Sequence, residues 1–181
     1  TFLDKQVSAR RRRDDDLKSG GNTLGIEEIE PWAESVVLGE VLDEIVMWLS
    51  RYIAADVLLM YTAALWSALA HTLSMVDVAP RLAAQSPGPG CGKTVLLEAI
   101  SNLTPRPVTA ASITAAVVFR IIEEVKPTLF LDEADQMLKD RSSPLVAVLN
   151  SSHRKSTAYV WRTEETVPGQ FVPVRFSTWA A

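Results

Sequence analysis

The glycine- and proline-rich segment at residues 86–94, SPGPGCGKT, constrains the fold of this chain more than any other feature. It matches the phosphate-binding pattern G-x-x-x-x-G-K-[ST] except at the first position, where Pro87 replaces glycine. Proline removes one backbone N–H and fixes φ, but the glycines that follow still allow the backbone to wrap around an anion. Such a loop joins a strand to a helix, so the segment predicts an α/β fold, unless it is a plain turn before a surface helix.

Each residue type in this loop has a separate role in binding a nucleotide. Small residues let backbone N–H groups approach the phosphates, Lys93 reaches the β and γ phosphates, and the Thr94 hydroxyl ligates Mg²⁺. We therefore predict ATP and Mg²⁺ as ligands. The predicted nucleotide-binding residues are Pro87, Gly88, Pro89, Gly90, Cys91, Gly92, Lys93, Thr94 and Val95.

A second segment, LFLDEAD at residues 129–135, supplies the carboxylates that phosphoryl chemistry needs. Its apolar half predicts a buried strand that ends at Asp132, and ligands bind at the carboxyl ends of parallel strands. Asp132 is predicted to hold the Mg²⁺ shell, and Glu133 to orient and deprotonate the attacking water. The alternative is a carboxylate-rich helix N-terminus, which the helix dipole favours. Both motifs, in this order, predict nucleotide binding and hydrolysis.

Strands and helices alternate after residue 80, which predicts a parallel sheet flanked by helices. Strands are expected at 81–86, 106–110 and 128–132, and helices at 94–103, 113–126 and 144–150. Ser112 and Ser143 are the expected N-caps of the last two helices, and Pro127 is expected to end the first of these. Two apolar runs around Pro168 and Gly169 predict a C-terminal β-hairpin.

The part of the chain before the loop divides into two predicted regions. Residues 1–30 combine a run of arginines, a run of aspartates and glycines, which is typical of a flexible polar lead-in. Residues 31–79 repeat apolar residues at three- and four-residue steps and predict a helical preface to a nucleotide-binding core at 80–181. The apolar run at 57–76 is long enough to span a bilayer, but its hydroxyl groups favour a buried helix instead.

The composition of the chain limits its predicted partners and its predicted cellular compartment. The net charge of −4 argues against a protein that coats nucleic acid through its overall field, although a local basic surface is compatible with it. The single cysteine, Cys91, cannot form an internal disulfide, and the first residues contain no apolar signal core. The sequence therefore predicts a cytoplasmic protein without a membrane segment.

Phosphoryl transfer also needs polar groups that sense the γ-phosphate and a cation for the developing charge. The sensor candidates are Asn150, at the end of a helix, and the pair Ser177 and Thr178, at the end of the last strand; helix-cap or strand-end hydrogen bonds are the alternative roles. A parallel last strand would bring Ser177 and Thr178 beside the γ-phosphate. The predicted catalytic residues are Glu133, Lys93, Asn150 and Thr178. The arginine-finger candidates, for each of which a surface ion pair is the alternative role, are Arg154, Arg162 and Arg175.

Four blocks of sequence together resemble a P-loop domain family of phage and prophage primase–helicase-like proteins, related to AAA+ and superfamily 3 helicase ATPases. They are PRLAAQSPGPGCGKTVLLEAISNLTPRP, ITAAVVFRIIEEVKPTLFLDEAD, LVAVLNSSHRK and VRFSTWAA, and the resemblance extends from about Pro31 to the C-terminus. In that family the loop typically reads S-P-x-x-x-C-G-K-T, so Pro87 and Cys91 follow the family pattern.

The resemblance implies a P-loop NTPase fold of AAA+ type and an ATP-driven motor on single-stranded or forked DNA, assembled as a homo-oligomeric ring. In such ATPases the hairpin before the sensor strand projects into the pore, which here makes Arg162, Gln170 and Arg175 possible DNA contacts; a plain edge hairpin is the alternative. The chain departs from the family because it ends directly after the sensor strand, without the expected fifth strand and the arginine-bearing segment. This implies a truncated core that hydrolyses ATP weakly alone.

Two other classes of protein share these motifs. A nucleotide-gated assembly or regulatory module would bind the nucleotide with little or no hydrolysis. A small-molecule kinase would share the loop and the Mg²⁺ site, but such a kinase usually lacks a glutamate next to the aspartate of the acidic strand. ATP turnover measured with and without single-stranded DNA discriminates the motor from both.

Overall fold

The structure is a computed structural model that describes residues 32–86, 88, 90–139 and 143–179. The predicted lead-in at 1–30 and the loop residues Pro87 and Pro89 lie outside these described residues. The chain divides into two compact units, which are described separately below. The described residues of unit 1 are 32–71 and 82–107, with residues 87 and 89 excepted, and those of unit 2 are 72–81 and 108–179, with residues 140–142 excepted. The helix after the glycine loop thus groups with the described helices that precede the loop.

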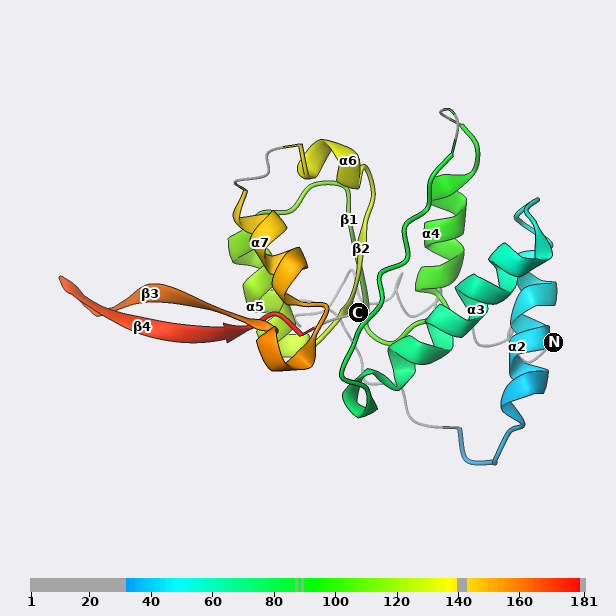
Figure 1. The fold of residues 1–181 in the computed structure, drawn as a ribbon, viewed down its shortest axis with the longest axis horizontal. Coiled ribbons are helices and arrows are strands. Elements are labelled where there is room, and N and C mark those ends of the chain that lie inside the picture. Colours follow the sequence, from blue (N-terminus) through cyan, green and yellow to red (C-terminus); the bar gives the residue numbers. More distant parts are fainter. Residues whose placement is uncertain (1–31, 87, 89, 140–142, 180–181) are drawn as a thin grey trace, which may run out of the picture. The chain divides into compact units, whose positions relative to one another are not determined.

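The described residues of unit 1 form three helices, α2 (Leu38–Leu49), α3 (Val57–His71) and α4 (Lys93–Ser101) (Figure 1). The predicted helices in this part of the chain are therefore confirmed. Helix α2 buries a stripe of large side chains that includes Trp48 and Leu49. Helix α3 packs against it and buries mostly small residues, which let two helices approach closely.

A side-chain hydrogen bond also ties α3 to α2. The Tyr61 hydroxyl donates to Asp43 Oδ1 at 2.6 Å, and this bond to the carboxylate raises the pKa of Tyr61. Because the pKa is raised in the folded state, any stability that this bond contributes is present at neutral pH. It is lost only when the pH rises above the ordinary pKa of tyrosine.

Among the described residues, no helix is long and apolar enough to cross a membrane.

The strand predicted at residues 81–86 is wrong, because these residues belong to no strand of the structure. Exposed and partly buried residues nevertheless alternate along the segment, with Leu82, Ala84 and Ser86 on the partly buried side. Alternation of this period is typical of an extended chain. No other strand of the described residues pairs with the segment, so it lacks the ladder hydrogen bonds that define a strand.

Unit 2 begins with a short 3₁₀ helix, η1 (Leu73–Met75), followed by a strand–helix–strand arrangement: β1 (Pro107–Ala110), α5 (Ala115–Val125) and β2 (Thr128–Leu131). The two strands form a small parallel sheet, which confirms the parallel pairing predicted for these two strands. The Asp132 N–H continues the ladder by donating to the Ala110 carbonyl at 3.0 Å. The prediction that Pro127 ends the helix is confirmed, with Lys126 left-handed at φ 48°.

The N-cap predicted at Ser112 is wrong. Helix α5 is capped by Thr114, whose extended backbone leads directly into Ala115 and whose side chain makes no capping bond. By contrast Ser143 caps α7 (Pro144–Ser151) as predicted, because its hydroxyl accepts a hydrogen bond from the Leu145 N–H. A one-turn helix, α6 (Ala134–Met137), lies between β2 and α7.

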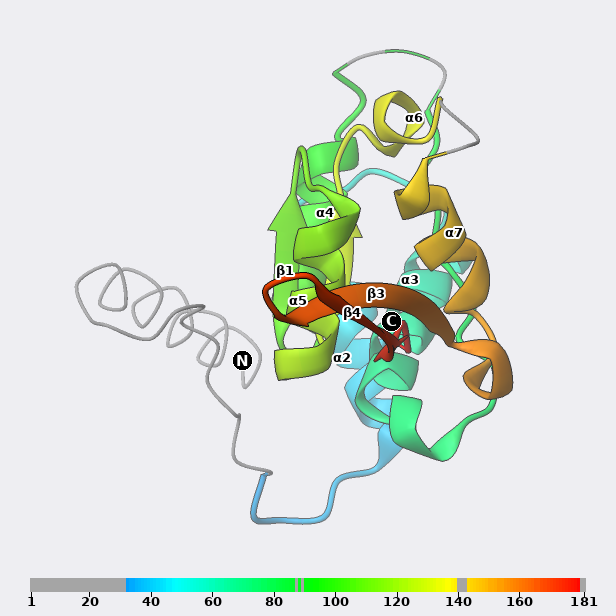
Figure 2. The ribbon, with the colours of Figure 1, turned by 90° about the vertical axis from the view of Figure 1, so that its left-hand side faces the viewer.

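A short 3₁₀ helix, η2 (Lys155–Thr157), leads to the predicted C-terminal hairpin, which is confirmed as β3 (Tyr159–Val167) and β4 (Gln170–Ser177). Gly169 has a φ of +82° in the turn that reverses the chain. Figure 2 looks toward the end of this hairpin, drawn in orange and red. Because β4 runs antiparallel beside β3, the prediction that the last strand joins the parallel sheet is wrong for the described residues, where each sheet has two strands.

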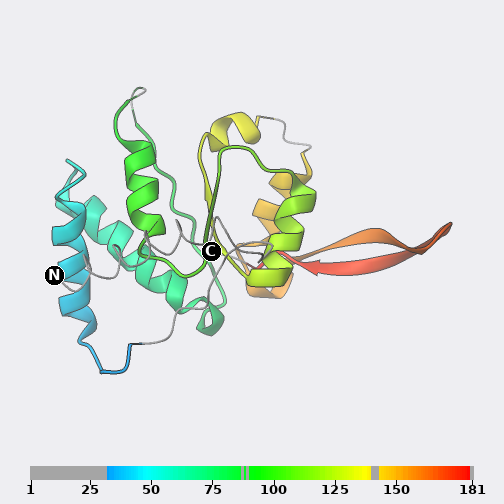
Figure 3. The ribbon, with the colours of Figure 1, turned by 180° about the vertical axis from the view of Figure 1, so that it is seen from behind.

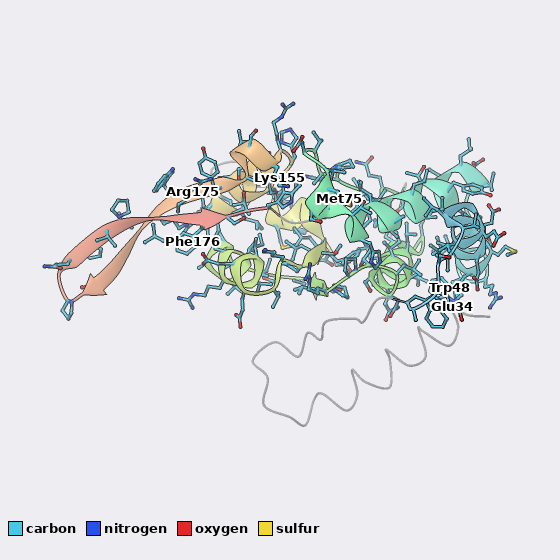
Figure 4. All side chains as sticks on the ribbon, turned by 90° about the horizontal axis from the view of Figure 1, so that it is seen from below. Glu34, Trp48, Met75, Lys155, Arg175 and Phe176 are labelled. Atoms are coloured by element: carbon cyan, nitrogen blue, oxygen red, sulfur yellow. The ribbon has the colours of Figure 1, made fainter. Side chains whose placement is uncertain are left out.

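The core of unit 2 lies where α5 and α7 meet the base of the hairpin (Figure 3). Phe119 of α5 packs against Phe176 of β4, with ring centroids 5.9 Å apart. Arg175 and Phe176 project from opposite faces of β4 (Figure 4), so one face of the hairpin joins the core and the other faces outward. The buried members of this core are Val118, Phe119, Ile122, Leu145, Val148 and Phe176.

Candidate functional site

The backbone of the glycine loop is left-handed at two glycines just before α4. Gly90 and Gly92 have φ values of +76° and +81°, and Gly92 is the residue immediately before the helix. A side chain is strained in this backbone region, whereas glycine adopts it readily. No side chain caps the helix at Gly92. The first turn of α4, which begins with Lys93 and Thr94, is exposed, as an anion-binding helix N-terminus requires.

Gly92→Ala is expected to lower the free energy of unfolding by about 1–2 kcal/mol, because alanine would have to adopt the left-handed conformation. Gly39→Ala is the matched control. Gly39 lies within α2, its φ is not positive, and a Cβ there would meet no atom within 4 Å. That replacement should raise the free energy of unfolding by up to about 1 kcal/mol. Urea denaturation measures both, and equal effects of the two changes would contradict this reading of the loop.

A hydrogen-bond chain spans the glycine loop. The Lys93 ammonium group donates to Ser86 Oγ at 3.0 Å, and Ser86 Oγ donates to the Gly88 carbonyl at 2.7 Å. Lys93 is exposed and Ser86 is partly buried. Ser86 was not among the residues predicted for the site, although it begins the quoted motif. The remaining predicted binding residues that the structure describes are all exposed, in the loop or in the first turn of α4. They are Gly90, Cys91, Gly92, Thr94 and Val95.

The acidic pair lies where β2 ends. Asp132 Oδ1 accepts a hydrogen bond from the Glu133 N–H at 3.0 Å, and Glu133 is exposed. Glu133 has a φ of +55°, which is uncommon for a residue with a side chain. Such strained positions concentrate at functional sites. Because the Asp132 N–H bonds to the Ala110 carbonyl, Asp132 and the following Glu133 lie at the carboxyl edge of the parallel strands, as the strand pattern predicted.

The predicted residues are divided between the two units. The glycine loop and Lys93 belong to unit 1, while Asp132 and Glu133 belong to unit 2. Within the described part of the chain, no three His, Cys, Asp or Glu side chains gather to hold a metal ion by themselves. Mg²⁺ at nucleotide sites takes most of its ligands from phosphates and water, so such a site does not require a group of three protein ligands.

The two sensor candidates differ in exposure. Asn150 is exposed at the end of α7, and its carbonyl lies 3.3 Å from His153 Nδ1. Thr178 is fully buried, with its hydroxyl 3.0 Å from Ser151 Oγ and its N–H donating to the Ala158 carbonyl. β4 is antiparallel to β3, so it is not the parallel last strand that was expected to bring Ser177 and Thr178 beside the γ-phosphate. Thr178 instead ties the end of the hairpin to the end of α7.

Two of the arginine-finger candidates contact aromatic rings. The Arg162 guanidinium lies 4.2 Å from the centroid of Phe119, and that of Arg175 lies 3.8 Å from the centroid of Tyr159. Such stacking stabilises a guanidinium without neutralising its charge. Arg154 forms an isolated backbone bridge with Val78, and its side chain is exposed.

Arg81 has a structural role that sequence reasoning missed. Its guanidinium donates to the Leu149 carbonyl and, at 2.7 Å, to Ser152 Oγ, so it supplies hydrogen bonds to the C-terminal end of α7. Partial burial of the guanidinium lowers the pKa of Arg81. The partners are far apart in sequence, and neither spacing nor composition indicates such a contact.

Comparison with known proteins adds no relative: no protein-family model matches the chain, and neither a curated protein nor a solved structure matches it.

Proposed function

We propose that this chain binds ATP with Mg²⁺ through the glycine loop and the start of α4, and that it hydrolyses ATP. The observation that carries the proposal is the left-handed Gly92, which joins the loop to an exposed helix N-terminus that begins with Lys93 and Thr94. Backbone N–H groups at a helix N-terminus and a nearby ammonium group together favour a phosphate chain.

The acidic pair supplies the second half of the proposal. Asp132 offers a carboxylate for the Mg²⁺ water shell, and Glu133 is an exposed carboxylate that can accept a proton from a water molecule. Both lie at the carboxyl edge of the parallel strands. Lys93→Ala tests the first half of the proposal through ATP affinity, and Glu133→Gln tests the second half through the rate of ATP turnover.

We further propose that the chain is an AAA+-like P-loop domain from the motor of a phage- or prophage-type replicative DNA helicase, which would act as a homo-oligomeric ring. The glycine loop followed by a helix, the parallel strand pair and the acidic strand end support this assignment. The missing ladder partner of residues 81–86 and the antiparallel β4 give it no support.

The outward face of the hairpin supports single-stranded DNA as the partner. Trp161 and Phe171 are 63% and 66% exposed on this face, and Arg175, opposite Trp161 in the register, lies on the same face. Exposed aromatic rings beside a guanidinium form a surface on which unpaired bases stack. The proposed contact set therefore includes Trp161 and Phe171 in addition to the arginine predicted from sequence.

Trp161→Ala and Phe171→Ala are each expected to weaken the binding of an oligo-dT strand by about tenfold, because each removes one stacking ring. Fluorescence anisotropy with a labelled strand measures the affinity. Val172→Ala, on the opposite face of the same hairpin, is the matched control and should leave the affinity unchanged. Equal affinities for the wild-type chain and both aromatic variants would show that DNA does not bind this face.

A further inference from the structure

Ser86 closes the glycine loop at the end opposite to the helix. It accepts the hydrogen bond from Lys93 Nζ at 3.0 Å, across the six intervening residues, and its own hydroxyl donates a hydrogen bond to the Gly88 carbonyl at 2.7 Å. From these contacts we infer that Ser86 is a positioning residue, which holds the Lys93 ammonium group where the phosphates of a bound nucleotide would lie. The inference rests on the proposed function, because it assigns a role within the same loop.

The chemistry of the two groups fits positioning rather than neutralisation. A lysine ammonium group has three N–H donors, and one bond to Ser86 leaves two for phosphate oxygens. The serine hydroxyl is neutral, so Lys93 keeps its full charge for the ligand. Because the Ser86 hydroxyl donates its hydrogen bond to the Gly88 carbonyl, the lone pairs of Ser86 Oγ accept the bond from the Lys93 ammonium group.

Ser86 is the more buried partner of the pair. Residues 82–86 alternate in exposure, and Ser86 is on the partly buried side together with Leu82 and Ala84. The serine hydroxyl is partly buried and bonded to the Gly88 carbonyl, whereas Lys93 is exposed on a long and flexible side chain. An acceptor held in this way restricts the lysine side chain before the ligand binds, which reduces the ordering that binding itself must supply.

Ser86→Ala is expected to weaken the binding of Mg²⁺·ATP and of ADP by about five- to tenfold and to leave the much weaker binding of adenosine unchanged, because the lysine acts on phosphates. Ser86→Thr keeps the hydroxyl and should restore the affinity. Ser101→Ala, at the far end of α4, is the matched serine control. Displacement of a fluorescent ATP analogue by each ligand measures these affinities for the wild-type chain and the three variants.

A double-mutant cycle separates positioning from a general structural role. If Ser86 acts through the ammonium group, Ser86→Ala should have no further effect on ATP affinity in the Lys93→Ala background. An undiminished effect in that background would overturn the inference, and so would unchanged or tighter ATP binding by Ser86→Ala alone. The proposed function fails differently: in that case the wild-type chain does not bind ATP, or Lys93→Ala binds it as well as the wild type does, and the role of Ser86 fails with it.

Discussion

Replacing Lys93 with alanine is expected to weaken the binding of Mg²⁺·ATP by about a hundredfold, because hydrogen bonds between charged groups are among the strongest in proteins. The exposed ammonium group begins α4, directly after the left-handed Gly92, and offers its charge beside the N-terminal N–H groups of the helix. Equilibrium displacement of a fluorescent ATP analogue gives the affinity, and circular dichroism verifies that the variant is folded.

Lys139→Ala provides the control for loss of a positive charge. Lys139 is exposed, follows α6 and donates to the Gln136 side chain, outside the glycine loop. Its replacement should leave ATP affinity within a factor of about two, because Lys139 belongs to neither the glycine loop nor the acidic pair and its ammonium group bonds to Gln136. Similar affinities of the Lys93 and Lys139 variants would mean that the loop does not hold the phosphates.

Glu133→Gln should lower the rate of ATP turnover by about a hundred- to a thousandfold while ATP affinity stays near that of the wild type, since a general base contributes on this scale to the chemical step alone. Glutamine preserves the size of the side chain at a position where the backbone is already left-handed, so the fold should tolerate it. Phosphate release under single-turnover conditions measures the chemical step, with and without oligo-dT.

Asp135→Asn is the matched control, because Asp135 is a second exposed carboxylate two residues further along the same segment. It should retain wild-type turnover. Equal turnover of the wild type and Glu133→Gln would contradict the role of Glu133. A wild-type chain that binds ATP but does not hydrolyse it, with or without DNA, would favour the nucleotide-gated module over the motor.

Local sequence signals predicted most of the secondary structure. The apolar periodicity of α2 and the proline after α5 act within a few residues, and both gave the correct elements. The hairpin followed from two apolar runs around Pro168 and Gly169. Strand pairing was not predictable in the same way: residues 81–86 have the alternation of a strand but no partner among the described residues, and β4 pairs with its hairpin neighbour. Pairing depends on contacts between distant segments, which periodicity does not encode.

The candidate site was predicted to a similar extent. The glycines of the loop and the position of Asp132 at a strand end followed from residue type and spacing. The left-handed backbone of Glu133 did not, because glutamate gives no sequence signal for positive φ. The burial of Thr178 also escaped prediction, since it depends on the contact with Ser151 across twenty-seven positions of sequence.

The central claim is that the chain binds Mg²⁺·ATP and that the glycine loop and the acidic pair both respond to the bound nucleotide. Backbone amide chemical shifts of the labelled chain, recorded during a titration with Mg²⁺ and a non-hydrolysable ATP analogue, test it most directly. We predict saturable shifts at Gly90, Gly92, Lys93 and Thr94, and shifts at Asp132 and Glu133 with the same dissociation constant. A titration that leaves the loop amides unchanged, or that moves them without moving those of Asp132 and Glu133, would contradict the account.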